Sequence, residues 1–166
     1  MLSKVISGGQ TGVDQAALRA ALACGVAQGG SCPPGRESEA GPIPAGLPVR
    51  ETAQDRSPDA PDVPRSLRTE RNVRDSDATL VLRPASVERA DPGTEWALRC
   101  AARLGRAVLV CDPADPEAAV RIARWIRALG IRTLNVAGPA ESACQGIGAL
   151  AERVLARAFG SIIAPR

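Results

Sequence analysis

The chain of 166 residues contains no histidine and no tyrosine, and it has one phenylalanine and two tryptophans. Without histidine, the sequence excludes a Ser-His-Asp or Cys-His catalytic apparatus, imidazole acid–base chemistry near neutral pH and zinc sites that need a histidine ligand. The scarcity of aromatic rings argues against the base-stacking surfaces of proteins that bind single-stranded nucleic acid. The core must therefore be built from Ala, Val, Leu and Ile.

Lysine is also nearly absent, since Lys4 is the only one, and arginine supplies almost all of the positive charge. A P-loop, which ends in Gly-Lys-Ser/Thr, is therefore excluded. The formal net charge of +3 suits a local anion site better than a surface that coats DNA or an acidic membrane. We expect no nucleic-acid partner and no membrane partner, and instead a small-molecule ligand.

The five cysteines are odd in number and include no Cys-x-x-Cys pair, which favours reduced core thiols in an intracellular protein. Nothing at the N-terminus resembles a signal peptide, and no apolar run approaches the roughly eighteen residues of a membrane span. A length near that of one domain, with 45% hydrophobic and 23% charged residues, predicts a single domain over residues 1–166. We expect a cytoplasmic protein.

Alternating strand and helix patterns predict a Rossmann-like, doubly wound α/β fold, with a mainly parallel sheet and helices on both faces. Short, continuously apolar segments predict buried strands at residues 4–7, 79–82, 107–111 and 133–137. Helical patterns cover residues 13–24, 94–104, 116–129 and 142–159, and we expect the glycine after each of them to end the helix: Gly25, Gly105, Gly130 and Gly160. In such a fold the ligand site lies at the carboxyl edge of the strands.

One region interrupts this alternation. Residues 33–64 contain eight of the fourteen prolines and no helical period. Short strands are candidates at 26–31 and 47–52. A loop of this length in a compact domain is either functional or disordered, and we expect an ordered segment that covers the carboxyl edge of the sheet.

The strongest candidate binding element is the turn Ser-Gly-Gly-Gln-Thr-Gly-Val-Asp at residues 7–14, between the first predicted strand and the first helix. Its glycines can present backbone N–H groups outward, and the helix N-terminus adds partial positive charge, so the turn can cradle phosphate or another oxyanion. It is neither a Walker loop nor a G-x-G-x-x-G fingerprint. The alternative is a tight turn with Thr11 as the N-cap. Asp14 then stabilises the helix dipole, or it contacts a ribose or pterin group.

Three further polar segments lie next to predicted strands. Arginines at three-residue intervals over residues 65–74 predict either a helix that leans guanidinium groups toward one anion or a solvated helix face. The segments at 91–95 and 135–142 each lead from a strand to a helix. Backbone N–H groups of Gly93 and Thr94 can contact an anion, or Thr94 caps its helix.

Five segments of the chain together resemble the molybdenum carrier family, which comprises the molybdenum cofactor carrier proteins. This family lies within the Rossmann-like superfamily that includes the lysine-decarboxylase-like proteins. The five segments are Gly-Gly-Gln-Thr-Gly-Val-Asp at 8–14, Cys-Pro-Pro-Gly-Arg at 32–36, Gly-Pro-Ile-Pro at 41–44, Thr-Glu-Arg-Asn-Val-Arg-Asp-Ser-Asp-Ala at 69–78 and Asn-Val-Ala-Gly-Pro at 135–139. The resemblance covers nearly the whole chain. It implies a homo-oligomer that carries and protects the molybdenum cofactor without known catalysis.

The resemblance also implies the cofactor-binding residues. The first binding loop consists of Gly8, Gly9, Gln10, Thr11, Gly12 and Asp14. The further candidates are Arg36, Asn72, Arg74, Ser76, Gly93, Thr94, Gly138, Glu141 and Ser142. A glycine loop with arginines suits the phosphate of the cofactor, and amide and carboxylate groups suit its pterin edge. We expect no catalytic residue and no metal ligand of the protein itself.

Nucleotide-binding proteins of the same superfamily are the alternative. Its phosphoribohydrolases use a P-G-G-x-G-T-x-x-E motif, but here Ala97 stands three places after Thr94, and the glutamate is Glu95. On a helix, with about 100° per residue, this shift turns the carboxylate roughly 160° away, which argues against that reaction. The hypothesis that the protein is a sensor that binds a nucleotide remains. Arg71 stands where we expect an aromatic residue in the carrier family, so the surroundings of Asn72 can differ.

Overall fold

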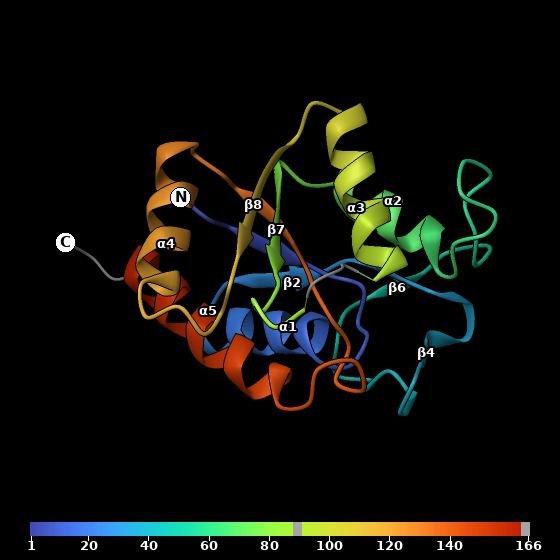
Figure 1. The fold of residues 1–166 in the computed structure, drawn as a ribbon, viewed down its shortest axis with the longest axis horizontal. Helices are drawn as coiled ribbons and strands as arrows, with labels where there is room; N and C mark the ends of the chain where they lie inside the picture. The colour runs from blue at the N-terminus through green and yellow to red at the C-terminus, as the bar shows by residue number, and fades with distance from the viewer. Residues whose placement is uncertain (88–90, 164–166) are drawn as a thin grey trace.

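The computed structural model of the chain describes residues 1–87 and 91–163, and a five-stranded sheet lies at its centre (Figure 1). Its strands are β1 (Lys4–Ile6), β2 (Ala27–Gly29), β7 (Ala78–Leu82), β8 (Ala107–Cys111) and β9 (Thr133–Ala137). They lie in the order β2-β1-β9-β7-β8, and every neighbouring pair is parallel. The predicted Rossmann-like fold class is confirmed.

Helices cover both faces of this sheet (Figure 1). On one face, α1 (Val13–Ala23) and α4 (Ala118–Ala128) both pack against α5 (Ile147–Ile163). On the other face, α2 (Ser66–Arg74) packs against α3 (Pro92–Arg103). In the part of the chain that the structure describes, no helix has the length and apolar character to cross a membrane.

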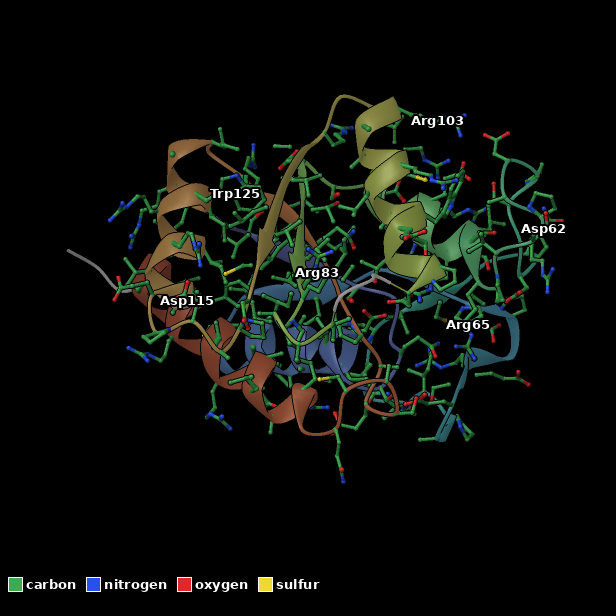
Figure 2. The ribbon with its side chains drawn as sticks, in the orientation of Figure 1. Asp62, Arg65, Arg83, Arg103, Asp115 and Trp125 are labelled. Atoms are coloured by element: carbon green, nitrogen blue, oxygen red, sulfur yellow. The ribbon has the colours of Figure 1, made fainter. Side chains whose placement is uncertain are left out.

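The main core lies between the sheet and the layer of α1, α4 and α5. Four alanines of α1 and two of α5 are fully buried there, and such small side chains let the two helices approach closely: Ala16, Ala17, Ala20, Ala21, Ala151 and Ala158. Trp96 of α3 belongs to a second, smaller core beneath α2 and α3, where its indole N–H donates to the Ser66 carbonyl at 3.2 Å. Trp125 points from α4 toward the sheet and is half-buried (Figure 2). The core is aliphatic, as the composition requires.

The strand order has a simple relation to the usual Rossmann order. If counting starts at β9 instead of β1, the strands read 3-2-1-4-5 across the sheet, which is the usual order of a doubly wound fold. β9 and α5 therefore occupy the places that an ordinary Rossmann chain fills with its first strand and helix. The strand order reverses between β9 and β7, and ligands of such sheets bind at that switch point.

The predicted helix ends are right in three cases and wrong in one. Gly25, Gly105 and Gly130 follow α1, α3 and α4 with φ of 69°, 61° and 63°, the left-handed conformation of a helix end. Gly160 does not end the last helix, because α5 continues to Ile163 and its buried side chains continue past the glycine at Ile162. The same helix begins at Ile147 rather than at residue 142, since turns occupy residues 141–146.

The prediction that residues 107–111 form a buried strand is wrong for all of them except Cys111. β8 lies at the end of the sheet, where only β7 pairs with it. Most of its residues are half-buried, and Val110 is 41% exposed. An apolar sequence alone does not distinguish a central strand from an edge strand.

The proline-rich segment is ordered through short pairings. β3 (Ser31–Cys32) pairs with β6 (Arg50–Glu51), and a 3-10 turn, η1 (Pro34–Arg36), leads into the hairpin of β4 (Glu37–Ser38) and β5 (Gly41–Pro42). Ile43, Leu47 and Val49 bury their side chains with two residues from outside the segment. Ile43 and Val49 lie against Gly9, so this segment covers the glycine-rich turn.

Replacing Gly160 with alanine tests the observed end of α5. The Cβ atom would meet open space, and alanine loses less conformational entropy in a helix, so we expect Gly160→Ala to raise the free energy of unfolding by up to about 1 kcal/mol. Urea denaturation measures the change. The matched control is Gly130→Ala, which also meets open space but has φ of 63° and should be destabilised. Equal destabilisation of both variants would contradict the helix end described here.

Candidate functional site

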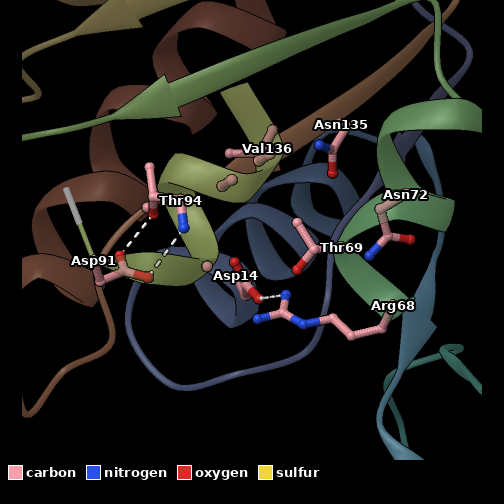
Figure 3. Close-up of a pocket in the computed structure, with 12 residues that line it drawn as sticks. Asp14, Arg68, Thr69, Asn72, Asp91, Thr94, Asn135 and Val136 are labelled. Carbon is pink, nitrogen blue, oxygen red and sulfur yellow. Dashed lines mark hydrogen bonds and ion pairs between the residues drawn. The ribbon is translucent and has the colours of Figure 1, made fainter. Parts of the chain in front are cut away.

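A small polar cavity lies at the switch point of the sheet, and we call it the inner cavity (Figure 3). Its volume is about 30 Å³, enough for one or two water molecules or a small polar group. It is formed by α1, α2, the N-terminus of α3 and the carboxyl end of β9. The lining residues are Asp14, Arg68, Thr69, Asn72, Asp91, Gly93, Thr94, Ala97, Asn135, Val136, Ala137 and Gly138.

A buried ion pair forms one wall of the inner cavity. Arg68 Nη1 of α2 lies 3.0 Å from Asp14 Oδ2 of α1, and their side chains are only 16% and 5% exposed (Figure 3). The backbone N–H of Gln10 also donates to this carboxylate at 3.3 Å. Burial raises the pKa of the Asp14 carboxyl above its ordinary value, while Arg68 and the Gln10 amide oppose that rise. Arg68 Nε, although buried, has no hydrogen-bond partner among the described residues.

The glycine-rich turn lies directly against this ion pair. A Cβ atom on Gly8 would come within 1.7 Å of Arg68 Nη1, so only glycine leaves space for the guanidinium. Gly9 and Gly12 have φ of 78° and 74°, a conformation that favours glycine. Within the described chain, the N–H groups of Gly8, Gly9, Thr11 and Gly12 donate to no acceptor. The turn therefore has four backbone N–H groups without an acceptor, and Gly8 among these residues lies against the guanidinium. The Oε1 atom of Gln10 is likewise buried without a partner in residues 1–87 and 91–163.

The N-termini of α3 and α5 already hold carboxylates of the protein. Asp91 accepts from the Thr94 amide at 3.0 Å and from its hydroxyl at 2.7 Å (Figure 3). Asp91, not Thr94, is thus the N-cap of α3. Glu141 accepts from the amides of Gly146 and Gly148 at 2.5 and 3.0 Å. These N–H groups are therefore occupied in the present structure, and the turn at residues 7–14 carries the free donors.

Thr11, the N-cap of α1 in the alternative interpretation of this turn, does not occupy that position. Gly12 occupies that position without a side-chain cap. The Thr11 hydroxyl instead donates to Glu39 of the covering segment and accepts from the Glu141 amide at 3.2 Å. Thr11 therefore joins three loops rather than capping the helix.

A second, open groove of about 760 Å³ lies on the outer side of the glycine-rich turn, and we call it the outer groove. It is lined by Thr11, Gly12, Gln15, Arg19, Glu39, Ala40, Glu141, Ser142, Gln145, Gly148 and Ala149. Glu39 bridges its two sides, because its carboxylate accepts from Thr11 Oγ1, from Ser142 Oγ and from the Ser142 amide at 3.1 Å. The bonds from Ser142 and Thr11 hold the pKa of the Glu39 carboxyl below its ordinary value.

Comparison with known proteins agrees with the strand order. The sequence model of the circularly permutated YpsA SLOG family matches residues 5–159. The chain belongs to this family. The words 'circularly permutated' describe the sheet found here. Its β9 and α5, at the end of the chain, occupy the places of the first strand and helix of an ordinary Rossmann chain.

One solved structure is similar over nearly its whole length. It is described as a putative molybdenum carrier protein from Syntrophus aciditrophicus SB, with 29% sequence identity and a TM-score of 0.80. The alignment covers 95% of this chain and 94% of that one. The resemblance to molybdenum carriers indicated by the motifs is confirmed. No curated protein matches the chain.

The structure of this SLOG family member divides the predicted site residues among several places. Asp14, Asn72, Gly93, Thr94 and Gly138 line the inner cavity. The outer groove receives four others: Thr11, Gly12, Glu141 and Ser142. Gly8, Gly9 and Gln10 lie in the turn between the two spaces, Gly8 against Arg68 and Gly9 beneath the covering segment.

Three predicted residues lie apart from both spaces and have structural partners. The Arg36 guanidinium donates to the carbonyls of Val49, Pro44 and Leu47 and thereby holds the covering segment together. Arg74 and Ser76 lie at the amino ends of the strands, opposite the carboxyl edge, just before β7 begins. The Ser76 hydroxyl donates to the Val73 carbonyl at 2.9 Å. Asn72 also has a structural contact. Its side-chain oxygen accepts from the Ser31 backbone N–H at 2.7 Å, and its side-chain nitrogen donates to the Ser31 carbonyl at 3.0 Å.

Arg68 and Thr69 were not among the predicted site residues, although a helical signal for them exists. With about 100° per residue, Arg68 and Thr69 lie within roughly 60° of Asn72 around a helix, whereas Arg71 and Arg74 lie roughly 100° and 160° away. Once Asn72 is assigned to the cavity, these angles predict that Arg68 and Thr69 are on the side of α2 that faces it. Asp91 and Asn135 belong to segments that the sequence indicated, but only the structure brings them to one cavity.

Replacing Gly8 with alanine tests the close contact with the ion pair. The new Cβ atom forces Arg68 away from Asp14, and we expect the free energy of unfolding to fall by about 1–3 kcal/mol, as for other overpacked sites. Urea denaturation measures the loss. Gly46→Ala is the matched control, since its Cβ atom meets open space on an exposed loop. A Gly8→Ala variant as stable as Gly46→Ala would contradict this packing.

The Glu39 bridge predicts a pH dependence. Its pKa is lower in the folded protein than the ordinary value of 4.5, so its bonds contribute stability above that pH and lose it as the pH falls through the folded-state pKa. We expect Glu39→Gln to be less stable than the natural protein at neutral pH, with the difference shrinking below pH 4.5. Denaturation at both pH values measures this. Glu37→Gln, two residues away in the same hairpin, is the matched control. A constant difference for Glu39→Gln would argue against the bridge.

Proposed function

We propose that the protein is a carrier that binds the molybdenum cofactor at the switch point of the sheet. The observation that carries the proposal is the set of donors without acceptors in and beside the glycine-rich turn at residues 7–14. The N–H groups of four residues in this turn have no acceptor in the described chain, and Gly8 of the turn lies against Arg68, whose buried Nε is also without a partner there. Such donors suit the phosphate of the cofactor. The solved relative described as a molybdenum carrier supports this ligand.

The size of the inner cavity limits which part of the cofactor enters it. At about 30 Å³ it admits a small polar group, whereas whole ligands of this kind need several hundred Å³. A neighbouring cavity of about 240 Å³ shares Asp91 and Thr94 with it and is mainly apolar, with Leu82, Val87 and Pro139 in its wall. The two spaces together suit a ligand with a compact polar end and a flat ring system.

The polar side chains of the inner cavity suit a pterin. A pterin edge presents both donors and acceptors, and the guanidinium of Arg68, the amide of Asn135 and the carboxylate of Asp91 supply both kinds of partner. The molybdenum is cargo in this proposal, and the protein holds the organic part of the cofactor. Its role is to bind the cofactor and to limit its contact with water and oxidants.

The residues of α3 favour carriage over hydrolysis of a nucleotide. Glu95 is exposed and does not line the inner cavity, whereas Ala97 does. The carboxylate of the phosphoribohydrolase motif therefore has no counterpart on the cavity side of α3. Two other carboxylates, Asp14 and Asp91, do line the cavity and can accept bonds from ribose hydroxyls. Nucleotide binding is accordingly the second candidate.

Retention of isolated cofactor tests the proposal. The protein is incubated with cofactor without oxygen and freed of unbound ligand, and molybdenum content and pterin fluorescence are then followed in air. We expect the natural protein and Gly46→Ala to retain the cofactor and prolong its lifetime, and Gly8→Ala to lose it because the donors and Arg68 are displaced.

Two results would contradict the carrier proposal. One is a natural protein that neither retains nor protects the cofactor. The other is stabilisation by nucleoside monophosphates, but not by the cofactor, in a thermal-shift panel, since a ligand raises the melting temperature only by binding the folded state. Release of free base from those nucleotides would establish the hydrolase instead.

A further inference from the structure

The outer edge of β8 is long and apolar for an unpaired strand. Its five residues are Ala-Val-Leu-Val-Cys, and β7 is the only neighbour within the described sheet. Natural proteins usually protect such edges with proline, lysine, a bulge or a very short strand. The opposite edge, β2, has three residues and is followed by Gly30 with φ of 131°. β8 has none of these protections.

The hydrogen-bonding groups of β8 that face outward can be identified from its pairing. The Cys111 carbonyl accepts from the Arg83 amide of the β7 side at 2.9 Å. Because backbone groups alternate in direction along a strand, those of Ala107, Leu109 and Cys111 face β7. The backbone groups of Val108 and Val110 therefore face away from the sheet.

The sequence around β8 is complementary to itself. If a second copy pairs antiparallel with Leu109 opposite Leu109, then Val108 lies opposite Val110 and each outward-facing pair exchanges both backbone bonds. In the same register Arg106 lies opposite Asp112 at both ends. Opposite charges at facing positions stabilise a strand pair, and like charges destabilise it. This register satisfies the apolar side chains, the backbone groups and the charges together.

The surroundings of the edge leave it accessible. Among the described residues, Arg106 and Val110 are exposed, and Asp112 is half-buried. Arg106 Nη2 donates to the Arg74 carbonyl of its own subunit at 3.3 Å, and the guanidinium has further N–H groups for a partner. The Asp112 carboxylate accepts from the amides of Ala85 and Ala114 at 3.0 and 2.8 Å, which holds it at the end of the strand with further lone pairs free.

The flanking helices add apolar surface. Leu104, which directly follows α3, is 46% exposed, and Val120 of α4 is 48% exposed. Both helices pack against β8, and they lie on either side of it (Figure 1). A strand pair alone buries less than the roughly 1,200 Å² of a stable interface, so these side chains contribute to the contact.

We infer that β8 is the dimer interface of this protein, with two copies joined by antiparallel β8 strands into one continuous ten-stranded sheet. The partner is a second copy of the chain, because the pairing register and the end charges are complementary only to themselves. A two-fold axis passes through the Leu109 pair. The carboxyl-edge sites of the two subunits lie apart from this axis, so cofactor binding is not required for the dimer.

Charge exchange at the strand ends tests the register. Sedimentation analysis should give the natural chain twice the mass of its 17.2 kDa. Arg106→Asp and Asp112→Arg each place like charges opposite one another at both ends, and each should weaken the dimer several-fold. Mixing these two variants restores both opposite pairs and should restore the dimer, as should the double variant. Failure of the mixture to associate, when each variant is folded by circular dichroism, would contradict the register.

A substitution at the centre of the edge tests the surface independently of those charges. Val110→Lys places a charge at an apolar pair on both sides and should give a monomer. Leu22→Lys is the control, because Leu22 is 68% exposed on α1, away from β8, and it should stay a dimer. A natural chain that sediments as a monomer at all concentrations, or a Val110→Lys variant that dimerises like the natural chain, would overturn the inference. Neither result depends on cofactor binding.

Discussion

The buried ion pair between Arg68 and Asp14 is the interaction on which the site depends. It joins α2 on one face of the sheet to α1 on the other, across the carboxyl edge. Breaking such a pair by removing one partner costs about 3–5 kcal/mol, because the remaining charge is left buried. The pair in turn requires a residue without a side chain at position 8, since the guanidinium occupies the space of its Cβ atom. Packing alone thus explains the glycine at this position of the turn.

The same pair sets the electrostatic character of the site. Asp14 neutralises most of the charge of Arg68, while Asp91 and Glu141 fill the N-termini of α3 and α5. With one guanidinium and three carboxylates, the site is not a positively charged pocket. For the proposed ligand, which has an anionic and a polar neutral part, backbone donors rather than net charge would then provide the main attraction for the anion. Binding by fixed dipoles at a preformed turn requires little rearrangement of the protein.

Much of the architecture follows from patterns along the chain. Apolar segments of four or five residues located β7, β8 and β9, and glycines located the ends of α1, α3 and α4. The end of α5 was missed because a glycine at position 160 looks the same in sequence whether it ends a helix or lies inside one. The position of β8 at the edge was missed because local apolarity carries no information on the neighbours of a strand. The order of the strands, which reveals the permutation, depends on pairings between distant segments.

The candidate site divides in the same way. The chain alone establishes which chemistry is available: with no histidine and one lysine, polar recognition must rely on backbone amides, arginine, amide and carboxylate side chains, and the glycine-rich turn follows directly from its local sequence. Only the tertiary structure decides which arginine serves the site. Arg68 faces the cavity, Arg36 holds a loop and Arg74 lies at the opposite edge of the sheet. The physical reason is that a guanidinium has no local conformational signature, so its role is fixed by the acceptors that folding brings within its reach.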